Sequence, residues 1–163
     1  MANWHTGLVI RPGPSSHTET RRRPMVKDIV RSPLLLRVPS EPAVPHSALD
    51  SEVGQDLLDT LAAHADECVG MAANMIGQRR RIIVVANGAR HMLMHNPEIL
   101  EASCPYQTEE GCLSLEGTRP CTRYRRIKVR YLDESWNERT FTFTGFIAEI
   151  IQHEIDHCDG VVI

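Results

Sequence analysis

The amino-acid sequence predicts an α+β domain, in which helices are segregated from antiparallel strands. Two observations support this prediction. Apolar residues recur three and four positions apart, as in an amphipathic helix, near residue 55 and again at the C-terminus. Between these segments lie short stretches rich in β-branched and aromatic residues, separated by turn-forming residues. Helices and strands therefore occupy different parts of the chain.

Residues 1–24 differ in composition from the rest of the chain. They include Pro12–Ser16 and Arg21–Pro24, carry four arginines against one glutamate, and show little hydrophobic periodicity. Such a segment cannot bury a core, so we predict that residues 1–24 are disordered and that residues 25–163 form one catalytic domain. The segment lacks the apolar stretch of a secretory signal, while its arginines leave an organellar transit peptide as an alternative.

The first predicted helix begins near Asp50 or Ser51, either of which can cap a helix, and runs to about Ala65. Its spacing places apolar side chains on one face, as an amphipathic helix against a core requires. This face comprises Val53, Leu57, Leu58, Leu61 and Ala62.

Four strands are predicted after this helix, and the last two form a hairpin. The turn of this hairpin is Asp133–Asn137, a run of turn-forming residues. In the last strand, Phe141 and Phe143 are two positions apart and should point together toward the core. The predicted strands are Arg81–Val85, His91–His95, Ile127–Leu132 and Arg139–Thr144.

The C-terminal segment Phe146–His157, which follows Gly145, is predicted to be a helix that is apolar on most sides. A helix of this kind belongs inside a domain. His153 and His157 are four residues apart and therefore share one face. Two buried imidazoles without partners are costly, so they should be hydrogen-bonded or bound to a metal.

The pentapeptide His153–His157 carries the chemistry of a metallohydrolase. Two histidines at this spacing can hold one metal ion, and Glu154 beside them can serve as the base for a water molecule. Chance recurrence of so short a motif is the alternative. A catalytic site usually takes a third protein ligand, and with six residues left after His157 it must come from upstream. The candidates are the five cysteines, the other histidines and the carboxylates.

Among these candidates, Cys112 stands out by its setting in Thr108–Leu115, which reads Thr-Glu-Glu-Gly-Cys-Leu-Ser-Leu. The glycine just before the thiol lets backbone approach an ion closely. The backbone amides that follow can face a bound group.

Three blocks of the sequence resemble the peptide deformylases, in that family's order. They are Gly70–Gly77, Glu110–Ser114 and His153–His157, and the second and third match the family pattern completely. The similarity runs from about Val26 to the C-terminus. It implies the deformylase fold, a central metal-binding helix surrounded by short antiparallel sheets.

The resemblance also implies the reaction, which removes the formyl group from the N-terminal formyl-methionine of nascent chains. It assigns Cys112, His153 and His157 as metal ligands, Glu154 as general acid and base, and the backbone N–H of Leu113 as a donor to the oxyanion. The family's metal in the cell is Fe²⁺, with Zn²⁺, Ni²⁺ or Co²⁺ as substitutes.

The first block departs from the family pattern Gly-x-Gly-x-Ala-Ala-x-Gln. Met75 replaces the glutamine that supplies the second oxyanion donor, and Cys68 replaces the first glycine. A thioether cannot donate a hydrogen bond, and losing one such donor typically costs about 10²–10³ in rate. Asn74 carries an amide, but adjacent side chains of a strand point to opposite faces. We therefore expect a reduced deformylase rate.

The substrate contacts are predicted to include Gly70, Met71, Met75 and Arg119. For Met71 and Met75, two interpretations stay open: core filling, and the lining of a pocket for an apolar side chain. For Arg119, contact with the peptide and a solvated surface position are the alternatives.

Composition fits one compact cytoplasmic enzyme. The chain has 163 residues, a net charge of −3 and five cysteines, an odd number without disulfide-like spacing. No apolar run reaches membrane-spanning length, so we expect no membrane partner. We also expect no specific nucleic-acid partner. Two arginine clusters, Arg79–Arg81 and Arg123–Arg126, suggest either transient contact with the ribosome or solvated strand edges.

Three functions remain open from the sequence. The first is a peptide deformylase that acts on formyl-methionyl peptides. The second is a related metalloamidase with a different acyl substrate, its oxyanion site reshaped around Asn74 and Met75. The third is a relative that binds metal or peptide with little turnover. The intact Glu154 argues against the third, and Met75 argues against full activity in the first.

Overall fold

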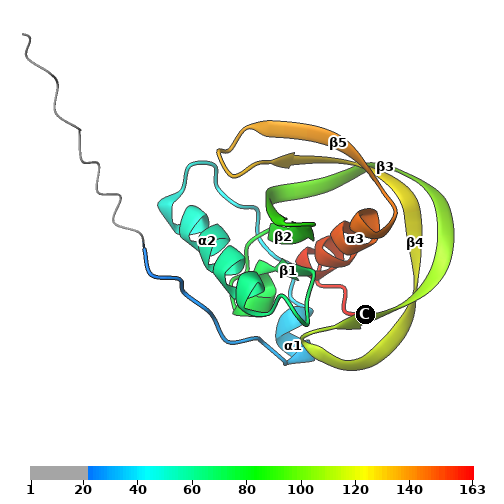
Figure 1. The fold of residues 1–163 in the computed structure, drawn as a ribbon, viewed down its shortest axis with the longest axis horizontal. Coiled ribbons are helices and arrows are strands. Elements are labelled where there is room, and N and C mark those ends of the chain that lie inside the picture. The colour runs from blue at the N-terminus through cyan, green and yellow to red at the C-terminus, as the bar shows by residue number, and fades with distance from the viewer. Residues whose placement is uncertain (1–21) are drawn as a thin grey trace, which may run out of the picture.

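The computed structural model describes residues 22–163 and has one sheet, with α3 (Phe146–Cys158) packed inside its curve (Figure 1). The sheet has five strands in the order β1-β2-β3-β4-β5, and every neighbouring pair is antiparallel. The α+β prediction is therefore confirmed. The strands are β1 (Gly70–Ala72), β2 (Ile82–Asn87), β3 (Arg90–Cys112), β4 (Leu115–Leu132) and β5 (Glu138–Thr144).

Strands β3 and β4 are much longer than predicted. The predicted segments His91–His95 and Ile127–Leu132 are only parts of them, and the rest carries mostly polar, exposed side chains. This part of the chain shows no clear apolar alternation, because neither face of it is fully covered. The extension brings Cys112, the last residue of β3, to the turn that leads into β4.

Helix α2 (Ala48–Ala63) starts two residues before the predicted Asp50. Its cap is Ser47, whose hydroxyl accepts a hydrogen bond from the backbone N–H of Asp50. The Asp50 carboxylate instead accepts from the backbone N–H of Val44, in the preceding loop. The helix boundary is therefore set by which of two nearby capping residues meets the free N–H groups. Two shorter helices are α1 (Pro33–Leu36) and the 3₁₀ helix η1 (Ala73–Ile76).

Strand β2 lies between α2 and α3, which cover its two faces. Ile82 and Val84 belong to the apolar cluster on the α2 side, and Ile83 and Val85 to the cluster on the α3 side. Successive side chains of a strand point to opposite faces. A run of four buried apolar residues is therefore what a strand covered on both faces requires.

The hairpin between β4 and β5 has the predicted turn at Asp133–Asn137, but one aromatic residue differs from expectation. Phe143 is half-buried and packs on the α3-side cluster. Phe141 is 52% exposed, so its predicted inward position is wrong. β5 is the last strand of the sheet and pairs only with β4 among the described residues, so no further strand covers Phe141.

The N-terminal extension falls largely on residues 1–21, which lie outside the described residues. Within the described part, Arg22 forms ion pairs with Asp56 and Asp59 on α2, and the backbone N–H of Met25 donates to Asp59. Among the helices of residues 22–163, none is both long and apolar enough to cross a membrane.

Candidate metal centre

Helix α3 supplies two of the predicted metal ligands and the predicted base. It begins after Gly145, whose φ of 67° suits glycine and turns the chain from β5 into the helix. His157 is 2% exposed and Glu154 3% exposed, while His153 is half-buried. The predicted burial of this helix is therefore confirmed.

Cys112 meets the two histidines at the end of β3. One donor atom from each of Cys112, His153 and His157 lies within 4.8 Å of the others, and Cys112 Sγ is 3.2 Å from His157 Nε2. No other group of three such donors occurs within residues 22–163. Three donors of this kind at this separation can hold one metal ion. The other cysteines, which the sequence left open as candidates, are not part of this group.

Glu110 orients His153 from β3. A carboxylate oxygen of Glu110 is 2.8 Å from Nδ1 of His153, so the other ring nitrogen is left for a metal. Arg123 on β4 donates two hydrogen bonds to the same carboxylate, at 2.7 and 2.8 Å, and a third to Asp156 at 2.6 Å. Burial would raise the pKa of Glu110, but the hydrogen bonds from Arg123 and His153 lower it to about 2.

Sequence reasoning missed Glu110, Arg123 and Asp156 as supporting residues. Glu110 lies inside a motif that was recognised, but its partner Arg123 is thirteen positions away on the next strand. The register of β3 against β4 places Arg123 opposite Tyr106. From there the Arg123 side chain reaches Glu110, further along β3. No spacing rule in the sequence gives that register.

Replacing Arg123 by Met should destabilise the fold by about 3–5 kcal/mol, the cost of removing one member of a buried ion pair. The Arg123 side chain is 5% exposed, so solvent cannot take over its role toward Glu110. Urea unfolding of the metal-loaded protein would measure the change. Arg130→Met, which breaks an exposed pair with Glu98, is the control and should change the free energy of unfolding little. Equal effects from the two substitutions would contradict this account.

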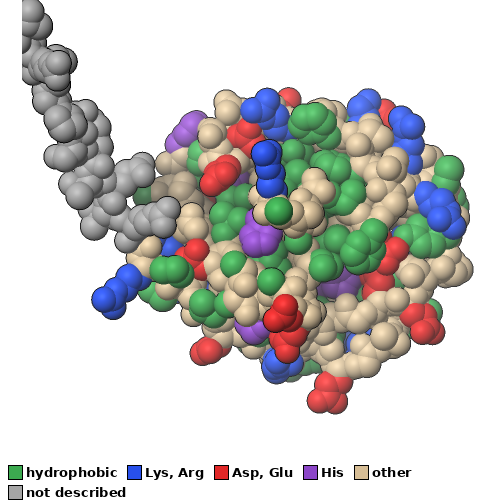
Figure 2. Space-filling view, viewed as in Figure 1, with side chains coloured by type: hydrophobic (Ala, Val, Ile, Leu, Met, Phe, Trp, Pro, Cys, Tyr) green, Lys and Arg blue, Asp and Glu red, His purple; other side chains and the backbone are tan. Residues whose placement is uncertain are grey.

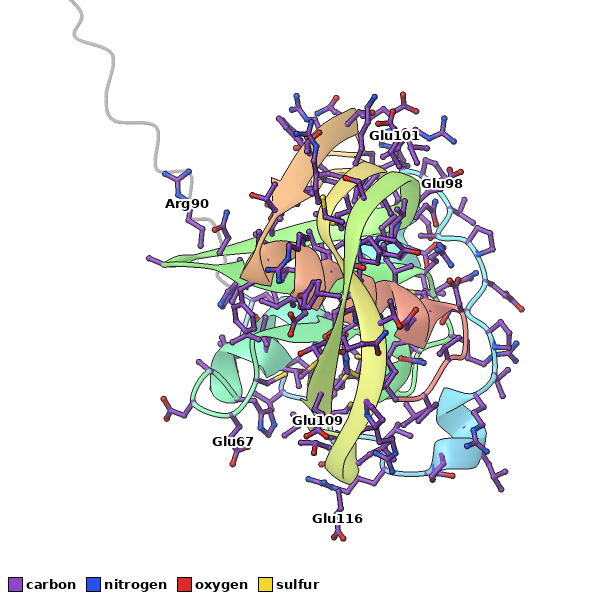
Figure 3. All side chains as sticks on the ribbon, turned by 90° about the vertical axis from the view of Figure 1, so that its right-hand side faces the viewer. Glu67, Arg90, Glu98, Glu101, Glu109 and Glu116 are labelled. Atoms are coloured by element: carbon purple, nitrogen blue, oxygen red, sulfur yellow. The ribbon has the colours of Figure 1, made fainter. Side chains whose placement is uncertain are left out.

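A cavity of about 270 Å³ opens beside Cys112 and His153, while His157 lies outside its walls. Its walls include six of the predicted site residues: Gly70, Met75, Cys112, Leu113, His153 and Glu154. The cavity lies between β1, the end of β3 and one face of α3. Glu67, from the loop before β1, and Glu109, from β3, also line it, and both are labelled in Figure 3.

Glu154 lines this cavity and carries an unsatisfied oxygen. Within residues 22–163 its Oε2 atom has no hydrogen-bond partner, although the residue is buried. Burial raises the pKa of Glu154 to about 7. A carboxylate with this pKa exchanges protons readily near neutral pH, as a general acid and base must.

Gly70 packs directly against Glu154 in the cavity wall. A Cβ atom built on Gly70 would lie 2.5 Å from a methyl carbon of Ile150 and 2.7 Å from Glu154 Oε1. Neither distance is tolerated between non-bonded atoms. Glycine is therefore required here for close packing against α3.

Replacing Gly70 by Ala should lower kcat/KM at least tenfold, because the added methyl group displaces the Glu154 carboxylate from its position. Steady-state kinetics on a formyl-methionyl peptide would measure this. Gly88→Ala is the matched control, since a Cβ there meets nothing within 4 Å, although its φ of 63° adds some backbone strain. Unchanged kcat/KM in Gly70→Ala would show that Glu154 does not depend on this contact.

Two predicted substrate contacts lie outside the cavity walls. Met71 is fully buried in the α2-side core, because it points away from the cavity on β1. Arg119 is exposed on β4 and its guanidinium donates to the backbone carbonyls of Glu116 and Ile163. The core interpretation of Met71 and the surface interpretation of Arg119 are the ones that fit. Figure 3 shows Glu116, whose carbonyl accepts from Arg119, at the end of the sheet where β3 turns into β4.

The segment with Asn74 and Met75 is a 3₁₀ turn rather than the strand assumed from sequence. The Asn74 amide donates to the backbone carbonyl of His157 at 2.8 Å, so it ties η1 to the end of α3. It is therefore occupied and does not replace the missing glutamine. Met75 does line the cavity, and its sulfur lies 3.5 Å from the backbone N of Ala72.

Comparisons with known proteins identify the family of this chain. The family model described as polypeptide deformylase matches residues 26–163. A peptide deformylase of Clostridium beijerinckii is 48% identical over 139 residues, which cover 85% of this chain and all of the relative. Peptide deformylase 1 of Clostridium perfringens is 41% identical over 111 residues, 66% of this chain and 74% of the relative.

Solved structures give the same result. A crystal structure of a class I type b peptide deformylase from Acinetobacter baumannii with Met-Ala-Ser bound has a TM-score of 0.77 and 28% identity. The alignment covers 86% of this chain and 97% of that one. The peptide deformylase of Thermotoga maritima has a TM-score of 0.76 at 30% identity, covering 85% and 94% of the two chains. The chain therefore belongs to the polypeptide deformylase family.

Proposed function

We propose that Cys112, His153 and His157 hold one divalent metal ion, beside which Glu154 moves protons in the family's reaction. That reaction is hydrolysis of the formyl group from the N-terminus of formyl-methionyl peptides. The observation that carries this assignment is the meeting of three donor atoms within 4.8 Å, next to the buried, unpartnered Oε2 of Glu154.

The donor set suits a borderline metal. One thiolate and two imidazoles are ligands for iron, zinc, cobalt or nickel, and Fe²⁺ is the ion we propose in the cell. When bound, such an ion lowers the pKa of water and polarises the formyl carbonyl. The thiolate ligand requires reducing surroundings. All five cysteines are free, which supports a cytoplasmic location.

Glu154 performs the proton transfers in this proposal. Its carboxylate takes a proton from the attacking water at Oε2 and later delivers one to the nitrogen of the departing amine. Its pKa of about 7 suits both steps. Glu110 and Arg123 hold His153 in one orientation throughout, so the donor geometry is fixed before the substrate arrives.

The oxyanion that forms on the formyl carbon requires hydrogen-bond donors. We assign the backbone N–H of Leu113, which lines the cavity next to Cys112, as one donor. Arg31 donates to the Leu113 carbonyl at 3.1 Å and so fixes this peptide group from outside the cavity. Met75 stands at the position of the second donor and cannot supply one.

The substrate of this proposal is a nascent peptide in the cavity, as the bound Met-Ala-Ser of the Acinetobacter relative suggests. Transient contact with the ribosome is proposed only for the exposed members of the two arginine clusters, Arg79–Arg81 and Arg123–Arg126. Arg80 and Arg81 pair with acidic residues of this chain, and Arg123 is buried. On the face in Figure 2, charges of both signs are interspersed around the margin, as on an ordinary solvated surface.

The experiment is turnover of formyl-Met-Ala-Ser by iron-loaded protein prepared without oxygen, with metal content measured in parallel. Wild-type protein should release formate and bind one metal ion, and Cys112→Ala should lose both. Cys104→Ala, which removes an exposed thiol, is the control. Stoichiometric metal in Cys112→Ala would overturn the ligand set. Bound metal without turnover in the wild type would favour another acyl substrate.

A further inference from the structure

Strand β1 presents a free edge to the cavity. It is the first strand of the sheet and pairs only with β2 among the described residues. The backbone N–H of Ala86 donates to the carbonyl of Val69 at 2.8 Å, so these two residues form a hydrogen-bonded pair. Such pairs alternate along an antiparallel ladder. Gly70, the next residue, therefore directs its N–H and C=O away from β2 and toward the cavity that it lines.

The carbonyl of Gly70 is already occupied by a side chain of the same chain. The thiol of Cys68 donates to this oxygen, with 2.7 Å between sulfur and oxygen. Cys68 is half-buried in the cavity wall, and burial raises the pKa of its thiol to about 11. The sulfur therefore keeps its proton at neutral pH and remains a donor.

A peptide substrate needs the same carbonyl. An extended peptide that binds a free strand edge uses the outward-facing backbone groups of that strand. The backbone of Gly70 also lies against Glu154, since a Cβ atom built on Gly70 would be 2.7 Å from Glu154 Oε1. A peptide whose formyl group is placed at Glu154 therefore brings the N–H of its first residue to the Gly70 carbonyl. The buried, unpartnered Oε2 of Glu154 independently marks this part of the cavity as the place for a bound group.

We propose that Cys68 controls substrate affinity by occupying the Gly70 carbonyl until the N–H of the peptide displaces its thiol. This inference rests on the proposed function. A second cavity, of about 480 Å³, also has Cys68 in its wall and shares Val69, Phe146 and Ile150 with the first. It provides space for the displaced thiol. Because glycine occupies this position in the family pattern, the competition is a property of this chain.

The consequence is measurable as a change in KM without an equal change in kcat. Removing the competing donor in Cys68→Ala should lower the KM for formyl-Met-Ala-Ser about three- to tenfold, the range of one hydrogen bond exchanged for another. Cys68→Ser retains a hydroxyl donor and should keep the wild-type KM within about twofold. Cys104→Ala is the control for loss of a thiol elsewhere, because Cys104 is exposed on β3.

A second measurement separates this inference from the proposed function. The unformylated peptide Met-Ala-Ser undergoes no turnover, and its Kd for metal-loaded protein should fall by the same factor in Cys68→Ala. Tighter binding without formate release in any variant would refute the deformylase assignment and retain the inference. Formate release with an unchanged Kd and KM in Cys68→Ala would overturn the inference. So would a Cys68→Ser variant that binds peptide as tightly as Cys68→Ala. Thermal unfolding of each variant verifies that it is folded.

Discussion

Replacing Glu154 by Gln is expected to lower kcat by about 10²–10⁴, the usual contribution of a general acid and base. The amide has the shape of the carboxylate but cannot accept a proton at Oε2. The site around it should persist, because Glu154 contributes none of the three donor atoms at Cys112, His153 and His157. Formate release under single-turnover conditions is the appropriate measurement, since it reports the chemical step.

Metal content distinguishes loss of the base from loss of the centre. Glu154→Gln should bind the same amount of metal as wild type, whereas Cys112→Ala should not. Glu149→Gln, on the same helix and in the same cavity wall, is the matched control and should retain most of the activity. A general base typically contributes at least about 10² in rate. If Glu154→Gln kept more than about a tenth of the wild-type kcat, another group would have to move the proton.

Replacing Met75 by Gln is expected to raise kcat by up to about 10²–10³, the value of one oxyanion donor. Met75 lines the cavity that also contains Leu113 and Glu154, so an amide at position 75 reaches the same space. The gain should appear in kcat more than in KM, because an oxyanion exists only in the transition state and the intermediate.

Met75→Leu is the control for the change in side-chain shape, because leucine has no donor. It should leave kcat near the wild-type value. A gain in Met75→Gln that vanishes in the double variant with Glu154→Gln would place both residues in one mechanism. Equal kcat for the wild type and Met75→Gln would mean that the two remaining sources of stabilisation, the Leu113 N–H and the metal, are sufficient.

The residues that could be found from sequence are those set by local geometry. The two histidines follow from helical periodicity, and Glu154 lies between them. Cys112 was one candidate of several until the family resemblance selected it, and the structure places it 3.2 Å from His157 Nε2. The positions of helices α2 and α3 and of strands β2 and β5 also followed from local patterns, whereas the full lengths of β3 and β4 did not.

The remaining features of the site could not be predicted from the sequence, because they depend on the long-range pairing of strands and on the local backbone conformation. Arg123 supports His153 only because β3 and β4 pair along their length in a register that brings Arg123 to Glu110. Met71 and Met75 look alike in sequence and both pack in the α2-side core, but only Met75, on the 3₁₀ turn that follows the strand, also lines the cavity. Arg119 lies on a strand whose outer face is uncovered, which no local pattern reveals.

The bond from Asn74 to the end of α3 bears on how this enzyme can evolve. Asn74 holds the His157 carbonyl, and the Met75 carbonyl accepts from the backbone N–H of Val30 at 2.8 Å. The turn is thus anchored by groups other than the side chain at position 75. The Met75 side chain itself is 1% exposed and packs in the α2-side core, so an apolar or amide side chain of similar length is the replacement that this position can accept at small cost in stability. The catalytic rate is open to adjustment there, in small genetic steps, while the metal site is inherited unchanged.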